Sequence, residues 1–108
     1  MSEPANDLSD LGRFSDPSLL ILASLAGGAK HGYAMMVDIE TMSGVRLGAG
    51  TLYGALTRLE RRGLIAPLAA EERRRPYQIT GLGATVLREQ LRGLEAFAAT
   101  GLRRLAAI

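Results

Sequence analysis

The alternation of apolar and polar positions from residue 16 onward predicts three short helices, a β-hairpin and a long final helix. The first helix begins at Asp16-Pro17, an N-cap residue followed by the proline that a first helical turn tolerates. The helix is apolar almost all round, through Leu19, Leu20, Ile21, Leu22 and Leu25, which indicates burial on several sides, and Gly27-Gly28 ends it near Ala26. Residues 1–15 are polar and acidic without an apolar period, so we expect a flexible N-terminal arm there.

The second and third helices are separated by a short connection. The second is expected over Gly32–Ser43, with an inward stripe at Met35, Ile39 and Met42. The third is expected over Gly50–Arg62, and its apolar face is formed by Leu52, Ala55, Leu56 and Leu59. At 100° per residue, the opposite face presents Gly50, Gly54, Thr57, Arg58 and Arg61, with Thr51 and Tyr53 on its flanks. Two helices in this order, the second with outward arginines, are typical of a helix-turn-helix.

Two strand-like runs follow, Leu64–Leu68 and Pro76–Thr80, and the charged stretch between them predicts a β-hairpin. Pro67 and Pro76 cannot donate to a central ladder, so both strands are expected to be edge-like. This hairpin would form a wing beside the helix-turn-helix.

A final helix is expected from Thr80, a candidate N-cap, to near the C-terminus. Its apolar residues are spaced alternately 4 and 3 apart, as in a heptad repeat: Leu87, Leu91, Leu94, Ala98, Gly101 and Leu105. Because such a helix normally needs a partner, we expect a homodimer joined by these helices, with the first helix packed against them. The expected interface residues are Leu19, Leu22, Leu87, Leu91, Leu94, Ala98, Leu102 and Leu105.

The predicted fold class is therefore mainly α with a two-stranded β-wing, a winged helix-turn-helix at residues 16–80 followed by a dimerisation helix at 81–108. A length of 108 residues fits one such unit, and 47% hydrophobic with 22% charged residues is a globular balance. The longest apolar run is far shorter than the roughly 20 residues that cross a bilayer, and no signal pattern opens the chain. We expect a soluble, cytoplasmic protein without membrane association.

Formal charge is distributed unevenly along the chain. Residues 1–45 carry a net charge of −4, residues 46–75 carry +4, and residues 76–108 carry +2. Nearly all of the positive charge is arginine, and Arg73–Arg75 lie at the expected hairpin tip. An α-helix fits the major groove of DNA, while a basic ribbon can follow the phosphates or enter the minor groove.

Each half of this arrangement has a simpler interpretation when taken alone. The helix arginines would suit a solvated face, and Arg73–Arg75 would suit a soluble loop tip beside Glu71-Glu72. In the order helix, turn, helix, basic hairpin, they predict that the partner is double-stranded DNA. The competing hypothesis is a winged-helix module that contacts only proteins.

The sequence contains no motif that supports an enzymatic function. Gly48-Ala49-Gly50 lacks the preceding strand and the complete glycine pattern of a dinucleotide loop. No nucleophile has a histidine and acid at a supporting spacing, and Glu71-Glu72 fall in an expected exposed loop. With no cysteine and a single histidine, His31, we expect no disulfide, no metal site and no cofactor.

Short motifs in the chain resemble those of PadR-like transcriptional regulators. They are His31-Gly32-Tyr33, Gly50-Thr51-Leu52-Tyr53, Ala55-Leu56, Arg58-Leu59-Glu60, Gly63-Leu64-Ile65 and Tyr77-Gln78-Ile79-Thr80 with Gly83. The resemblance covers about residues 17–90, with the motifs in the family's order and spacing. The short C-terminal segment is similar to that of smaller members, which have one dimerising helix. Gly54 departs from the proline common in the family at this position, and the wing tip is short.

The resemblance implies roles for individual residues. Thr51 and Tyr53 would contact phosphates or base edges, and Arg58 would lie along the groove. Tyr33 would contact the DNA backbone or pack in the core, two alternatives that the sequence leaves open. The expected DNA-binding residues are thus Tyr33, Gly50, Thr51, Tyr53, Gly54, Thr57, Arg58, Arg61, Arg73, Arg74 and Arg75.

The remaining motif residues are expected to be structural. We expect His31 to organise the turn before the second helix, Tyr77 and Ile79 to face the core, and Glu60 to act as a polar lock within the fold. The resemblance also implies a small apolar or aromatic effector near the dimer helices, with ordinary dimer packing as the alternative. Its candidate residues are Leu94, Phe97, Ala98 and Gly101. The expected function is a regulator, a repressor, that binds a palindromic operator as a homodimer.

Overall fold

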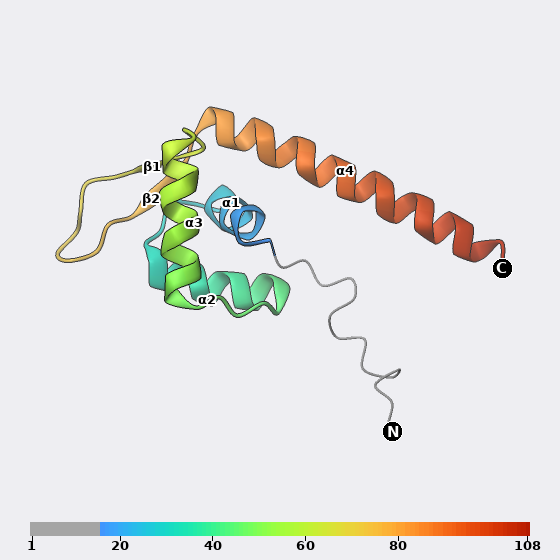
Figure 1. Ribbon diagram of the computed structural model, residues 1–108, viewed down its shortest axis with the longest axis horizontal. Coiled ribbons are helices and arrows are strands. Elements are labelled where there is room, and N and C mark those ends of the chain that lie inside the picture. The colour runs from blue at the N-terminus through green and yellow to red at the C-terminus, as the bar shows by residue number, and fades with distance from the viewer. Residues whose placement is uncertain (1–15) are drawn as a thin grey trace, which may run out of the picture.

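The computed structural model describes residues 16–108, so the arm predicted at residues 1–15 lies outside the described part of the chain. Its elements are α1 (Pro17–Ala26), α2 (Gly32–Ser43), α3 (Ala49–Arg61), β1 (Ile65–Pro67), β2 (Tyr77–Ile79) and α4 (Gly81–Ala106). Figure 1 shows α1, α2 and α3 packed together, the β1–β2 hairpin extending to one side and α4 projecting to the other. This is the predicted class, a winged helix-turn-helix with a long C-terminal helix.

Side-chain caps explain where α1 and α4 begin. The carboxylate of Asp16 accepts a hydrogen bond of 3.0 Å from the backbone N–H of Ser18. Thr80 Oγ1 accepts one of 3.0 Å from the N–H of Gly83. Both N-caps agree with the sequence prediction. Each satisfies one of the backbone donors that the first turn of a helix leaves unpaired.

The hydrophobic core lies where α1 is covered by α2, α3 and the start of α4. The buried apolar residues from α1 to α3 are Leu19, Leu20, Ile21, Leu22, Leu25, Met35, Ile39, Leu52, Ala55, Leu56 and Leu59. One predicted core residue was wrong: Met42 is 46% exposed. It continues the stripe of Met35 and Ile39, but it lies in the last turn of α2, which the core does not cover.

The wing is an antiparallel pair in which Ile65 lies opposite Ile79 and Pro67 opposite Tyr77. Lys30 extends this sheet by one residue, because its backbone N–H and C=O both pair with Tyr77, at 3.2 and 3.1 Å. The strands are shorter than predicted. Proline has no N–H to donate, and beyond Pro67 the pairing is reduced to the bond from Leu68 N to the Pro76 oxygen, at 2.8 Å, and an isolated bridge between Glu71 and Arg74 at the tip, with bonds of 2.7 and 2.9 Å.

A partly buried polar cluster ties α1 to α2. Ser24 is the buried polar residue of the described core, and its hydroxyl donates to the Asp38 carboxylate at 2.6 Å. The Lys30 ammonium lies 3.8 Å from the same carboxylate and donates to the Ser24 carbonyl oxygen. Because each buried polar group has a partner, the cluster avoids the free-energy cost of unpaired burial.

The end of α3 and the start of α4 are held together directly. Thr80 donates from Oγ1 to the Gly63 oxygen at 2.7 Å, and from its backbone N–H to the Leu64 oxygen at 3.1 Å. Gly83, in the first turn of α4, lies so close to the Leu64 carbonyl that a Cβ atom would collide with it. The helix after the wing is thus fixed against the wing without a flexible linker.

Candidate nucleic-acid interface

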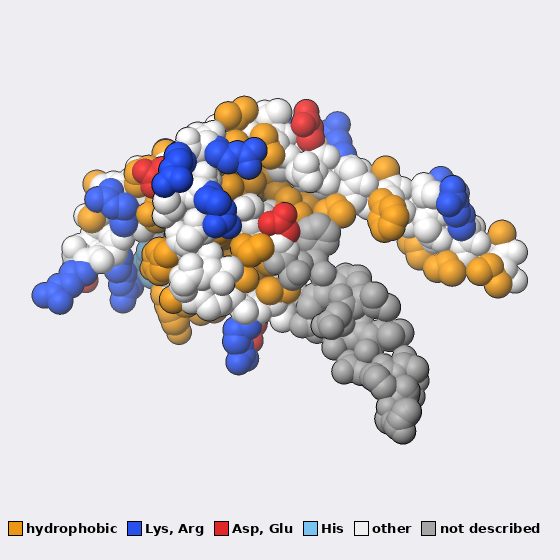
Figure 2. All heavy atoms as spheres, viewed as in Figure 1, with side chains coloured by type: hydrophobic (Ala, Val, Ile, Leu, Met, Phe, Trp, Pro, Cys, Tyr) orange, Lys and Arg blue, Asp and Glu red, His pale blue; other side chains and the backbone are white. Residues whose placement is uncertain are grey.

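The polar face of α3 is exposed as predicted. Its buried side is formed by Leu52, Ala55, Leu56 and Leu59. The exposed residues are Gly50, Thr51, Tyr53, Thr57, Arg58 and Arg61, while Gly54 is half-buried. Figure 2 shows basic side chains over one end of α3 and over the wing, on a single face of the molecule.

Tyr53 leans from α3 onto the beginning of α2. A Cβ atom at Gly32 would collide with the Tyr53 hydroxyl and would lie 2.9 Å from its Cζ atom. Glycine at this position therefore lets the ring approach the α2 backbone, while 51% of Tyr53 stays exposed. Tyr33, one residue further on, is 68% exposed, so the structure favours a surface position over packing in the core.

His31 organises the start of α2, as the sequence predicted. It is the N-cap residue, and its Nδ1 accepts a hydrogen bond of 3.5 Å from the N–H of Ala34. Its other ring nitrogen, Nε2, lies 3.3 Å from Nη1 of Arg74 in the wing. The histidine thus connects the wing to the helix-turn-helix, a contact that the sequence spacing of 43 residues does not reveal.

The three wing arginines do not have equivalent surroundings. Arg75 donates from Nη1 to the Leu68 carbonyl oxygen at 3.0 Å and braces the hairpin, while Arg74 approaches His31. Within residues 16–108, the structure records no hydrogen bond or ion pair for the side chain of Arg73, which is exposed. The wing arginines therefore combine structural contacts with free positive charge.

Between α2, α3 and the wing lies a polar hollow of about 290 Å³. Its lining residues are His31, Gly32, Tyr33, Tyr53, Arg73, Arg74, Arg75 and Tyr77. The N-terminal end of α2, with its partial positive charge, borders the same space. Three guanidinium groups, tyrosine hydroxyls and a helix N-terminus make the hollow suited to an anion.

Tyr77 belongs to the structural side of this hollow. It is half-buried and packs against the core, as does Ile79, in agreement with the prediction. Burial, and then the negative charge of Glu60, raise the pKa of Tyr77 above its ordinary value, and Arg75 opposes this effect. Neutral Tyr77 is therefore the form that the fold favours.

The side chains of Glu60 and Arg46 have surroundings that their positions in the sequence do not indicate. Glu60 is exposed, and within residues 16–108 its side chain has no recorded hydrogen bond or ion pair, so these residues lend no support to the expected polar lock. Arg46, which adds to the positive middle segment, pairs with Glu40 at 2.9 Å. The free positive charge of the segment therefore lies on α3 and the wing.

Most of α4 projects beyond the core with apolar side chains exposed. Leu87 is buried and Leu94 half-buried in the protomer, whereas Leu91, Phe97, Ala98, Leu102 and Leu105 are exposed. Phe97 is 76% exposed. Of the expected effector residues, Phe97 and Ala98 thus lie on an open helix face in the single protomer, whereas Leu94 packs against the core.

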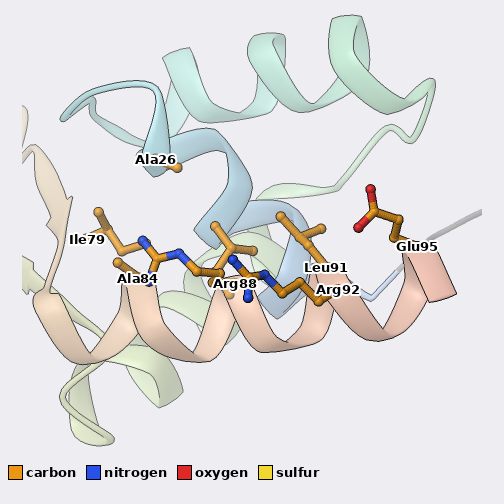
Figure 3. Close-up of a pocket in the computed structure, with 8 residues that line it drawn as sticks. Ala26, Ile79, Ala84, Arg88, Leu91, Arg92 and Glu95 are labelled. Atoms are coloured by element: carbon orange, nitrogen blue, oxygen red, sulfur yellow. The ribbon is translucent and has the colours of Figure 1, made fainter.

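A larger hollow, of about 460 Å³, lies between the end of α1, β2 and the first half of α4. Figure 3 shows Leu91 pointing from α4 toward α1, while the side chains of Arg88 and Arg92 lie along α4 and lean toward Ile79. The space is apolar at its base and charged at its rim. Sequence reasoning did not find it, because it depends on how α1 crosses α4.

Two residues expected in the dimer interface lie elsewhere. Leu19 and Leu22 are buried in the core of the single protomer, Leu22 with only 3% exposure. They have almost no surface left for a partner, because α1 is enclosed by the other helices. Their contribution to an interface is restricted to supporting α4 from within.

No group of residues within 16–108 has the composition and geometry of a metal site. Across the same residues, every helix falls short of the length and apolarity required to cross a bilayer.

These features define a winged helix-turn-helix, an architecture widely used to contact DNA, here extended by a long C-terminal helix. Comparison with protein families identifies the group more closely: the model of the transcriptional regulator PadR-like family matches residues 21–89, and the chain belongs to this family. The resemblance inferred from the motifs is confirmed. Membership in a family of regulators also agrees with the expectation that the chain is not an enzyme.

Solved structures share the fold. A PadR family transcription regulator from Clostridium difficile R20291 is 24% identical, with a TM-score of 0.74 over 82% of this chain and 97% of that one. A transcriptional regulator from Clostridium thermocellum is 26% identical, with a TM-score of 0.68 over 89% and 94% of the two chains.

A relative in sequence occurs within a larger protein. An uncharacterised 37.1 kDa protein in transposon Tn4556 of Streptomyces fradiae is 46% identical over 78 residues, which is 72% of this chain and 23% of that protein. The chain therefore spans about a quarter of that relative.

Proposed function

We propose that the protein is a DNA-binding transcriptional repressor, in which two copies joined through α4 place their α3 helices in successive major grooves of a palindromic operator. The observation that carries the proposal is the position of the arginine-lined hollow beside the exposed face of α3. One surface offers anion contacts and a groove-sized helix together, which a module that contacts only proteins does not require.

The two parts of this surface suit different parts of DNA. The hollow, with Arg73, Tyr33 and the start of α2, suits a backbone phosphate, which fixes position without reading sequence. The exposed face of α3, with Thr51 and Arg58, suits base edges in the major groove. Tyr53 lies between them and contributes to either.

The dimer is supported by the exposed apolar side chains of α4. Leu91 and Leu105 are two heptads apart, and Leu102 lies about one turn before Leu105, on a helix that projects from the body. A row of this kind would be unfavourable in water, and a second α4 would cover it. We further propose that a small apolar or aromatic effector acts at this interface, near Leu94 and Phe97, by changing how the two helices pack.

DNA binding can be tested by titrating a labelled duplex from upstream of the protein's own gene at several salt concentrations. A dimer with about 8 phosphate contacts should lose on the order of a thousandfold or more in affinity between low and moderate salt. Arg73→Ala removes one contact per protomer and should lower the slope of log affinity against log salt by about 1.8. Arg104→Ala, at the far end of α4, is the matched control. A flat salt response in the wild type would contradict the proposal.

The dimer can be tested separately by light scattering. Leu102→Glu with Leu105→Glu places four charges in the proposed interface and should give a folded monomer, because neither residue contributes to the protomer core. Ala96→Glu, on the opposite side of α4, should leave the dimer intact. A wild-type monomer at micromolar concentration, or a dimer in the double variant, would refute dimerisation through α4.

A further inference from the structure

Arg58 and Gly54 form a pair on the exposed side of α3. They are separated by one helical turn, and therefore by about 40° around the helix axis. A Cβ atom at position 54 would lie 3.6 Å from Nη1 of Arg58. The guanidinium of Arg58 thus lies over Gly54, in the direction in which helical side chains lean, toward the N-terminus.

This position of the guanidinium over Gly54, here called the seat of Arg58, brings its N–H donors toward the part of α3 that is best placed to contact DNA bases. Recognition helices contact bases mainly through residues in their N-terminal half. Arg58 itself lies in the third turn, but its guanidinium lies at the level of the second. Gly50, one turn before Gly54, has open space around its Cβ position. The backbone between the two glycines can therefore approach base edges closely, with Arg58 reaching over it.

Other polar groups on α3 are less suited to reading a base. Thr57 already donates its hydroxyl hydrogen to the Tyr53 carbonyl oxygen at 2.9 Å. Arg61 is the last residue of α3, about two turns beyond Gly54. Arg62 lies past the helix end and lines a hollow formed with α1 and α4. Arg58 is the long side chain with free donors at the middle of the face.

We propose that Arg58, seated on Gly54, selects a guanine in each half of the operator. The inference rests on the proposed DNA binding. Guanine presents two acceptors in the major groove, O6 and N7, which match the two parallel N–H groups of a guanidinium. One such contact discriminates between base pairs by about 5- to 150-fold. The prediction is therefore a sequence preference concentrated at one base pair per half-site.

The test is enrichment of binding duplexes from a random library with the full chain, followed by titration of the enriched duplex with each base pair replaced in turn. The wild type should enrich a guanine at one fixed position in each half-site. Arg58→Lys keeps the charge but loses the two-pronged geometry, so it should lose that preference and keep the rest of the motif. Arg61→Ala, the matched control, should weaken all duplexes about equally and keep the guanine.

Gly54→Leu tests the seat. Leucine favours helix formation, so the fold is retained, but its side chain occupies the space of the guanidinium. This variant should lose the same guanine preference although Arg58 is present. Three results would overturn the inference: a motif without a fixed guanine, a preference unchanged in Arg58→Lys, or a preference unchanged in Gly54→Leu. If the wild type enriches no sequence and binds no duplex, the proposed DNA binding itself fails.

Discussion

Two glycines of α4 test how firmly this helix is locked to the rest of the fold. Gly83→Ala adds a methyl group that would collide with the Leu64 carbonyl and would lie 2.9 Å from Cγ1 of Ile79. Gly93→Ala adds the same group in the same helix, where nothing lies within 4 Å. Position 93 is also off the apolar row of α4, so the comparison is independent of dimer packing.

The two substitutions should change stability in opposite directions. Alanine is favoured over glycine in a helix interior by about 1 kcal/mol, so Gly93→Ala should stabilise by up to that amount. At position 83 the obstacle is backbone, which cannot rotate away, and overpacking typically costs about 1–3 kcal/mol. Moving α4 to relieve it would also stretch the bond from Thr80 to Gly63. We expect Gly83→Ala to be destabilised by about 2 kcal/mol net.

Thermal unfolding followed by circular dichroism provides the assay, at one protein concentration because the Tm of the proposed dimer would depend on concentration. At about 4–8 °C per kcal/mol, the Tm of Gly83→Ala should fall by about 8–16 °C, while that of Gly93→Ala should rise by a few degrees. If the Tm of Gly83→Ala lies within about 2 °C of the wild-type Tm, the close approach of α4 to the wing is refuted.

Other contacts give further predictions. Ser24→Ala leaves the buried side of Asp38 without its donor and should cost about 1–2 kcal/mol in urea unfolding, whereas exposed Thr41→Ala should change stability by less than about 0.5 kcal/mol. Gly32→Ala should displace the Tyr53 ring and weaken DNA binding, and its stability cost should largely vanish in a Tyr53→Ala background. Equal costs in both backgrounds would contradict the contact. Because the pKa of Tyr77 is raised in the folded state, its stabilising effect is complete below the unfolded pKa of about 10 and is lost as the pH rises through the folded pKa. Tyr77→Phe should remove that alkaline loss, as measured by unfolding at neutral and alkaline pH.

Local chemistry made much of the fold predictable. The N-caps Asp16 and Thr80 carry their own acceptor oxygens, so helix starts could be placed from the sequence. The amphipathic pattern of α3 likewise identified its buried and exposed faces. The ends of the strands could be placed only approximately. Pro67 and Pro76 each remove one N–H donor from the ladder, and the effect on strand length depends on the register of the two strands, which the sequence does not give.

The candidate site was predictable in its residue types but not in its contacts. The approach of Arg74 to His31, the ring of Tyr53 on Gly32 and the pairing of Lys30 with Tyr77 all join residues distant in sequence. None leaves a periodic signal. Leu22 was predicted in the dimer interface but is buried in the core of the protomer, for a similar reason. An apolar helix suits both a core and an interface, and only the packing of α1 between the other helices distinguishes the two.

The connection between α3 and α4 determines how dimer packing could control DNA binding. Gly63 follows α3 and Thr80 precedes α4. The Thr80 hydroxyl donates a hydrogen bond of 2.7 Å to the Gly63 carbonyl oxygen. Gly83 also lies close to the Leu64 carbonyl, so the segment that follows α3 is joined directly to the first turn of α4. A change in the angle at which two α4 helices cross would therefore be transmitted to the spacing of the two α3 helices. Since a palindromic operator would fix that spacing at about one helical turn of DNA, or 34–36 Å, an effector bound at the proposed α4 interface would alter affinity without contacting DNA.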